Sequence, residues 1–257
     1  MTEEVKADRS VTELSREQKS ERCTAVILAA GKGLRMGGET RKQYLEVGGM
    51  PLFAYSLRTM DQCGFITDIL VTVPEGDQEY CRETIEHFGL GGKVRKIVAG
   101  GRERCFSVHN ALQAVDWICD YVFIQDSARP FLEKGTLDRL LDAVRAYKAC
   151  IAAVPAKDTV KIADENGFVA QTPNRKDVWQ VQTPQVFDFE LIKKAHERMV
   201  EQYDELLDKG VIITDDAMVA EYFTGTKVKL VMASYRNIKV TTPEDMDTVS
   251  AYMKENN

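Results

Sequence analysis

Apolar residues in this chain form short runs that alternate with longer segments of helical spacing. The runs are typical of buried strands, and they lie at 24–29, 68–73, 94–98, 121–125 and 150–154. Between them, apolar residues three and four positions apart predict helices over 51–62, 76–88, 106–118 and 133–147. Strands that alternate with helices form parallel βαβ units. The pattern therefore predicts an α/β fold, a Rossmann-like and mostly parallel sheet flanked by helices.

The pattern changes after Pro155. Residues 155–184 are polar, with short alternating pieces and a turn signal at Glu165-Asn166-Gly167, which predicts an inserted β-hairpin arm. So short a hairpin is not stable alone, so we expect it to pack on a second copy of the chain in a homodimer. The α/β pattern then resumes, with helices at 188–202 and 214–223, strands at 228–232 and 237–241, and a C-terminal helix that opens at Pro243.

Charge and composition divide the chain and narrow its class. Residues 1–22 are highly charged and almost without large apolar side chains, so we expect a disordered extension before a single domain over 23–257. The net charge of −6 disfavours nucleic-acid binding, which needs a basic surface. No apolar stretch is long enough to span a membrane, and no signal sequence opens the chain. Six cysteines without a C-x-x-C pair indicate reduced thiols and a cytoplasmic protein.

The first predicted strand leads into a glycine-rich loop, "LAAGKGLRMGG", from Leu28 to Gly38. Backbone amides in such loops approach phosphates closely, and Arg35 is placed to meet their charge. The loop departs from the dinucleotide fingerprint, because the third glycine comes one residue late and the acidic residue expected about 20 positions further on is missing. A P-loop string is also absent. The alternative interpretation of this loop is a tight glycine turn with an exposed arginine.

Other cations lie in distinctive strings: Lys42 in "RKQYL", Arg129 after Asp126 in "QDSARPF", Arg175 on the arm and Lys239 in "NIKVTTPED". The three histidines form no cluster with carboxylates, and the nucleophile motifs of common hydrolases are absent from the sequence. Cations without a catalytic histidine suit phosphoryl transfer, where positioning and charge stabilisation do most of the work.

Eight strings, in this order, resemble the 2-C-methyl-D-erythritol 4-phosphate cytidylyltransferases of the non-mevalonate isoprenoid pathway. They are "AVILAAGKGLRMG", "RKQYL", "AGGRERCFSV", "QDSARPF", "PAKDTVK", "QTPQVF", "ITDDA" and "NIKVTTPEDM". The resemblance begins at about residue 24 and runs to the C-terminus. It implies transfer of CMP from CTP to methylerythritol phosphate, release of pyrophosphate, and Mg²⁺ held mainly by the triphosphate and not by a protein metal site.

The resemblance also implies roles for individual residues. Arg35 and Lys42 would stabilise the charge that develops at the α-phosphate. Residues expected to bind the nucleotide are Ala29, Ala30, Gly31, Gly33, Gly101, Ser107 and Asp126, with Gly101 and Ser107 toward the cytosine and Asp126 toward the ribose. Residues expected to hold the polyol phosphate are Arg129, Thr159, Arg175, Thr183 and Lys239, of which Arg175 and Lys239 count as catalytic. The arm would reach in from the neighbouring subunit.

Two positions depart from the family pattern inside these strings. Arg41 stands before Lys42, where proline is usual, and Gln125 precedes Asp126, where histidine is usual. Neither removes a group of the implied mechanism, so we expect altered kinetic constants and retained chemistry.

Three other functions remain open at this point. A related cytidylyltransferase for ribitol 5-phosphate shares the loop, the lysine and the D-x-x-R string, but tends to read "AGG" and "AVRP" where this chain has "AAG" and "SARP". A nucleotide-binding module without catalysis predicts loss of at least one of the cations, all of which are present. A nicotinamide-dependent oxidoreductase fits the fold class but not the glycine spacing.

Overall fold

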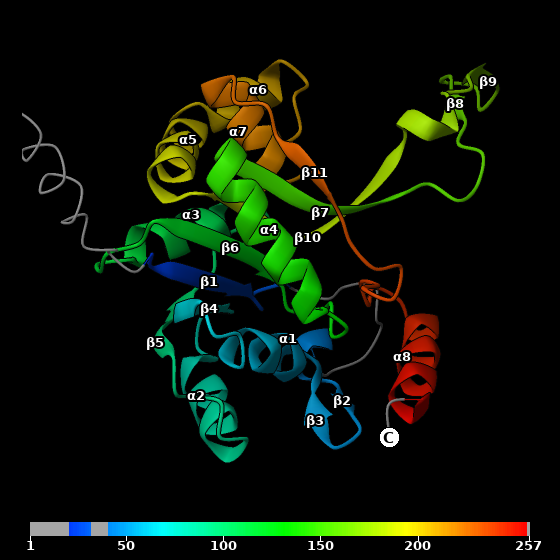
Figure 1. Cartoon of the computed structure of the whole chain (residues 1–257). Coiled ribbons are helices and arrows are strands. Elements are labelled where there is room, and N and C mark those ends of the chain that lie inside the picture. Colours follow the sequence, from blue (N-terminus) through cyan, green and yellow to red (C-terminus); the bar gives the residue numbers. More distant parts are fainter. Residues whose placement is uncertain (1–20, 32–40, 256–257) are drawn as a thin grey trace, which may run out of the picture.

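The computed structural model describes residues 21–31 and 41–255, and Figure 1 shows its central sheet with helices on both faces. The sheet has seven strands in the order β11-β7-β10-β6-β1-β4-β5. Their bounds are Cys23–Leu28 (β1), Ile66–Val73 (β4), Val94–Ala99 (β5), Tyr121–Asp126 (β6), Ala149–Pro155 (β7), Trp179–Asp188 (β10) and Lys229–Met232 (β11). The strands pair in parallel except β10, which runs antiparallel to both β6 and β7. The prediction of a mostly parallel α/β sheet is confirmed.

Successive side chains of the strands enter two separate cores, as the alternation of a pleated strand requires. Ala25 and Ile27 of β1 pack on one face, and Val26 packs on the other. The first face is covered by α1 (Leu52–Asp61), α2 (Gln78–His87), α4 (Lys134–Tyr147) and α8 (Pro243–Glu255). The second is covered by α3 (Arg104–Ala114), α5 (Phe189–Glu201), α6 (Tyr203–Asp208) and α7 (Asp216–Thr224). Because both faces are covered, the strands read as nearly continuous apolar runs in the sequence.

The predicted arm stands away from the sheet between β7 and β10 (Figure 1). Its strands β8 (Ile162–Ala163) and β9 (Val169–Gln171) form an antiparallel pair, which is followed by the 3-10 helix η3 (Arg175–Asp177). The predicted turn is present: the Gly167 N–H donates to the Asp164 carbonyl at 3.1 Å, and Gly167 has a φ of +83°, which glycine adopts without strain.

The structure corrects the sequence prediction at four places. Residues 179–184, assigned to the arm, belong to β10, whose polar first half pairs with the end of β7. Residues 237–241, predicted as a strand, form a loop, in which the Val240 N–H donates to the Ala128 carbonyl at 2.9 Å. The sequence analysis also did not predict α6, or the 3-10 helix η2 (Lys42–Tyr44) and the small hairpin of β2 (Glu46–Val47) and β3 (Met50–Pro51) that follows it.

Candidate active site

The carboxyl ends of β1 and β6 open into a cavity of about 270 Å³. Open α/β sheets bind their ligands at this edge. The loop after β5, the turn after β6 and the segment before α8 complete the walls. The described lining residues are Leu28, Ala30, Gly31, Gln43, Gly101, Arg102, Glu103, Arg104, Ser107, Asp126, Ser127, Ala128 and Lys239. Among them, the residues singled out from the sequence are Ala30, Gly31, Gly101, Ser107, Asp126 and Lys239.

Glycines allow the loop after β5 to approach the loop after β1. A Cβ atom on Gly100 would lie 2.2 Å from the Cβ of Ala30, and one on Gly101 would lie 2.3 Å from the Cβ of Phe106. The Gly101 N–H donates to Ser107 Oγ at 3.0 Å, and that hydroxyl donates to the Glu103 carbonyl at 3.2 Å. These bonds fix the Ser107 hydroxyl at the cavity wall and leave it one acceptor position for a ligand.

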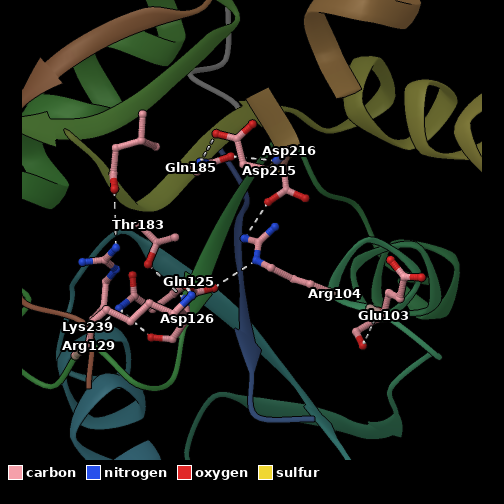
Figure 2. Close-up of polar contacts among 12 residues, drawn as sticks. Glu103, Arg104, Gln125, Asp126, Arg129, Thr183, Gln185, Asp215, Asp216 and Lys239 are labelled. Atoms are coloured by element: carbon pink, nitrogen blue, oxygen red, sulfur yellow. Dashed lines mark hydrogen bonds and ion pairs between the residues drawn. The ribbon is translucent and has the colours of Figure 1, made fainter. Parts of the chain in front are cut away.

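Asp126, the last residue of β6, is the charged centre of the cavity (Figure 2). Its carboxylate accepts hydrogen bonds from Lys239 Nζ at 2.6 Å and from Arg104 Nε at 3.1 Å. Burial alone would raise the pKa of Asp126, but the charges of Arg104 and Lys239 outweigh burial and hold this pKa well below its usual range. The carboxylate is therefore anionic at neutral pH and can accept hydrogen bonds from a ligand hydroxyl.

Lys239 reaches Asp126 from the loop before α8. The neighbouring Val240 is buried and anchored to Ala128, so the loop is held against the turn that follows β6. The Lys239 side chain keeps about a third of its surface exposed, at 35%. It therefore combines a fixed position with access to an anion in the cavity.

Arg129 and Thr183 lie outside the described lining of the cavity and hold the backbone segments around it in place. Arg129 is buried, and its guanidinium donates to the Asn237 carbonyl at 2.7 Å and to the Val181 carbonyl at 3.5 Å. Thr183, also buried, accepts a hydrogen bond from the Asp126 N–H at 3.0 Å. In this single chain both residues position Asp126 and the Lys239 loop. Ala29 likewise lies in the core, where its N–H donates to the Thr72 carbonyl at 2.8 Å.

Thr159 and Arg175 are exposed on the arm and are not brought to the cavity by this chain. Arg175 Nη1 donates to the Lys157 carbonyl at 3.1 Å, a bond within the arm itself. Their side chains belong to a different region from the charged centre.

Three residues of the glycine-loop prediction are not covered by the structure. Gly33 and Arg35 lie outside the described residues, as does the side chain of Lys42, whose backbone opens η2. Their roles stay predictions from the sequence.

The two departures from the family pattern have partners. Arg41 Nη1 pairs with Asp77 Oδ2 at 3.2 Å, so the added charge beside Lys42 is met by a carboxylate. Gln125 is fully buried, and its Nε2 donates to the carbonyls of Asp126 at 3.1 Å and Arg129 at 3.4 Å. Gln125 thus braces the turn that follows β6.

Sequence reasoning missed several residues at the cavity. Arg104 joins Asp126 to the buried Asp216, and Glu103 Oε2 accepts a 2.5 Å hydrogen bond from the Tyr203 hydroxyl. Gln43 is 1% exposed, and its side-chain nitrogen and oxygen have no hydrogen-bond partner in the described structure. Arg104 and Glu103 stand inside the "GGRERC" string and Asp216 inside "ITDDA", so the strings contained the signal. The missing information was which charges face each other.

Comparison with known proteins identifies the family of the chain. Residues 23–255 match the sequence profile of 2-C-methyl-D-erythritol 4-phosphate cytidylyltransferase. The chain belongs to the 2-C-methyl-D-erythritol 4-phosphate cytidylyltransferase family. The resemblance inferred from the eight strings is confirmed.

Relatives in this family align over nearly their whole length. The cytidylyltransferase of Geotalea uraniireducens is 44% identical over 239 residues, 92% of this chain and 98% of that protein. That of Caldanaerobacter subterraneus is 41% identical over 232 residues, 90% of this chain and 99% of that protein.

Solved structures of the family share the fold. The 4-diphosphocytidyl-2C-methyl-D-erythritol synthase of Anaerococcus prevotii superposes with a TM-score of 0.78 at 35% identity, over 91% of this chain and 97% of that one. The cytidylyltransferase of Francisella tularensis gives 0.72 at 27% identity, over 90% and 99%. No helix in the described part of the chain is long and apolar enough to cross a membrane.

Proposed function

We propose that this protein transfers CMP from CTP to 2-C-methyl-D-erythritol 4-phosphate, which gives 4-diphosphocytidyl-2-C-methyl-D-erythritol and pyrophosphate. The observation that carries the proposal is the cavity at the carboxyl edge of the sheet. There the glycine walls, Ser107, Asp126 and Lys239 meet, in a chain that belongs to a family of cytidylyltransferases.

The reaction needs no protein nucleophile. A phosphate oxygen of the polyol phosphate attacks the α-phosphorus of CTP, a new P–O bond forms, and the bond from the α-phosphorus to the bridging oxygen breaks. The electron pair leaves with pyrophosphate. The attacking oxygen is already anionic, so a general base is not required, and catalysis depends on positioning and on cations that neutralise developing charge. We propose that Arg35 and Lys42 neutralise that developing charge.

Subsites follow from the walls of the cavity. The Gly101–Ser107 wall is proposed for the cytosine, and Asp126 for the ribose hydroxyls, for which its anionic carboxylate is a suitable acceptor. The backbone of Ala30 and Gly31 would line the phosphates, next to Ala29 and Gly33. Lys239 is proposed to bind the polyol phosphate, because its ammonium faces the cavity.

Magnesium is the proposed cofactor. The described lining supplies two carboxylates, Asp126 and Glu103, and no group of three or more acidic, histidine or cysteine side chains in the described ranges could hold a metal on its own. So few carboxylates fit an Mg²⁺ ion held mainly by the CTP phosphates, because Mg²⁺ at nucleotide sites often binds through substrate phosphates with few protein ligands. When bound, the ion would neutralise charge on the triphosphate and the departing pyrophosphate.

The arm is proposed to complete the site of a neighbouring subunit in a homodimer. Phe168, Val169 and Ile162 on the arm are 73%, 61% and 46% exposed, which favours a covered position in an assembly. Thr159 and Arg175 would then reach the polyol phosphate from the partner. The cytoplasm is the proposed location, since all six cysteines, each within the described residues, are free thiols.

The test follows pyrophosphate release from CTP and Mg²⁺ with either methylerythritol phosphate or ribitol 5-phosphate. Release with methylerythritol phosphate alone is the expected result. Release with ribitol phosphate alone would keep the chemistry and change the substrate. Silence with both, together with calorimetric binding of CTP, would indicate a binding module. Binding of NAD without CTP would contradict the family of reactions altogether.

A further inference from the structure

Arg104, the first residue of α3, lies between two carboxylates from distant parts of the chain (Figure 2). Its Nε is 3.1 Å from Asp126 Oδ1, and its Nη2 is 2.8 Å from Asp216 Oδ2. Two different nitrogens of one planar guanidinium therefore contact two different anions. Asp126 lines the cavity, whereas Asp216 stands outside its described lining.

Asp216 is held in place by β10. It is fully buried at the first residue of α7. Its backbone N–H donates to Gln185 Oε1 at 3.0 Å, and Gln185 Nε2 donates to Asp215 Oδ2 at 2.9 Å. Because Gln185 lies within β10, its hydrogen bond fixes the backbone of Asp216 relative to the sheet.

Burying a carboxylate costs solvation free energy, and pairing it with a cation often fails to recover that cost. A role in stability therefore does not by itself explain why Asp216 is buried. Burial raises the pKa of Asp216, but Arg104 and the adjacent His196 outweigh burial and lower that pKa. His196 Nε2 lies 3.3 Å from Asp216 Oδ1, and both side chains are fully buried. The protein thus keeps an anion away from water, directed at Arg104.

We propose that Asp216 is a positioning residue for the nucleotide subsite: it fixes the plane of the Arg104 guanidinium, and Arg104 in turn fixes the carboxylate of Asp126. A guanidinium with a single contact can turn about it, whereas contacts from two of its nitrogens to two separate carboxylates restrict its orientation. This inference rests on the proposed function, since it assigns the aligned Asp126 to CTP.

The sign of the effect separates positioning from simple electrostatics. If Asp216 acted only through its charge, its removal would strengthen the binding of the anionic triphosphate, because a nearby negative charge is lost. If Asp216 positions Asp126, the same change weakens CTP binding.

The experiment measures the dissociation constant of Mg²⁺–CTP by calorimetry, together with the KM for CTP and kcat. We expect Asp216→Asn to raise the dissociation constant and the KM about tenfold, the size of one misaligned charge-assisted bond, with kcat changed less. Arg104→Lys keeps the charge but cannot contact both carboxylates with a planar fork, and we expect a similar loss. The double variant should bind CTP as tightly as the single variant with the lower affinity, because the effects of substitutions at residues in direct contact are not additive.

Asp204→Asn is the matched control. Asp204 pairs with Arg102 beside the cavity at 3.4 Å, but its side chain is exposed, so CTP binding should equal that of the wild type. If Asp216→Asn does not fold, Arg104→Lys carries the test, and an unchanged KM for CTP in that variant overturns the inference.

The outcomes distinguish the inference from the proposed function. Wild-type protein that binds CTP and releases pyrophosphate, with Asp216→Asn binding CTP equally or more tightly, overturns the inference alone. A dissociation constant for CTP raised about a hundredfold in the double variant, the product of the two single effects, would also overturn the inference alone. Wild-type protein that neither binds CTP nor releases pyrophosphate overturns both.

Discussion

The cavity and the arm are built in opposite ways. In the cavity, Asp126 is bonded to Arg104, Lys239 and Thr183, which come from separate elements of the fold. On the arm, the Arg175 guanidinium bonds to a carbonyl of the same arm, and large apolar side chains face outward.

This difference separates two tasks. Groups locked by several partners are preorganised, which suits recognition of the nucleotide and of the charge that develops on it. The arm carries Thr159 and Arg175, which are proposed to bind the polyol phosphate and lie outside the described lining of the cavity of this chain. The comparison therefore implies that changes on the arm affect the second substrate alone. Changes in the cavity should affect CTP and chemistry, and at Lys239 the second substrate as well.

The largest expected effect is on turnover. Lys42→Met or Arg35→Met should lower kcat by about a hundredfold to a thousandfold, the usual loss when one charge-stabilising donor is removed from a transition state, and should weaken CTP binding much less. Steady-state kinetics with calorimetry measures both. Arg41→Ala is the neighbouring control, because Arg41 is paired with Asp77, and it should retain turnover. Equal losses in kcat and CTP affinity would contradict the assigned roles.

Asp126→Asn should come next. It removes the negative charge that holds two cations and one of the two acceptor oxygens, and it should weaken CTP binding about tenfold to a hundredfold, as expected for a hydrogen bond to a charged group. The KM for the polyol phosphate should change less. Binding of CTP with wild-type affinity would remove Asp126 from the nucleotide subsite.

Arg175→Ala tests the arm. We expect the KM for methylerythritol phosphate to rise about tenfold through loss of one charged contact, with the affinity for CTP unchanged. The thermal midpoint should also hold, because Arg175 is exposed. Lys176→Ala, the adjacent exposed cation, is the matched control and should leave both constants as they are. A lower affinity for CTP with an unchanged KM for methylerythritol phosphate would contradict the assignment of the arm to the second substrate.

The smallest effect concerns acid stability. The pKa values of Asp126 and Asp216 are lowered in the folded protein, so their contribution is present above the unfolded pKa of about 4 and is lost as the pH falls further. Asp126→Asn should therefore lose less stability than the wild type between about pH 6 and pH 3. Urea unfolding at both pH values measures this, with Asp204→Asn as the control expected to match the wild type. Parallel losses in Asp126→Asn and wild type would contradict the charge assignment.

The sequence predicted the repeating part of the fold well, because apolar runs and helical spacing report burial directly. It failed where local pattern and tertiary role differ. The first half of β10 is polar because it extends from the sheet along the arm, so it looked like a loop. Conversely, 237–241 looked like a strand because its apolar residues alternate with polar ones, yet that segment is a loop that the Val240 N–H anchors to the turn after β6.

For the site, the strings located the strand ends and therefore the cavity. They did not show that Thr183 and Arg129 bond to the backbone of neighbouring segments, or that Arg104 is shared by two carboxylates. Such pairings join residues more than 20 positions apart, and the spacing of charges along a chain does not encode them. A search for buried cations near the predicted Asp126 would require the fold first.

One site is proposed to combine the cavity of one subunit with the arm of another, and mixed dimers test this arrangement most directly. Lys239→Ala and Arg175→Ala chains are unfolded together, refolded as a mixture and assayed for pyrophosphate release at a methylerythritol phosphate concentration well below its KM, where a raised KM lowers the rate. With random pairing, half of the dimers are mixed and one of the two sites in each is intact, so activity should return to about a quarter of the wild type. Activity no higher than the average of the two parent variants would show that each arm serves its own chain, or that the arm has no part in the site.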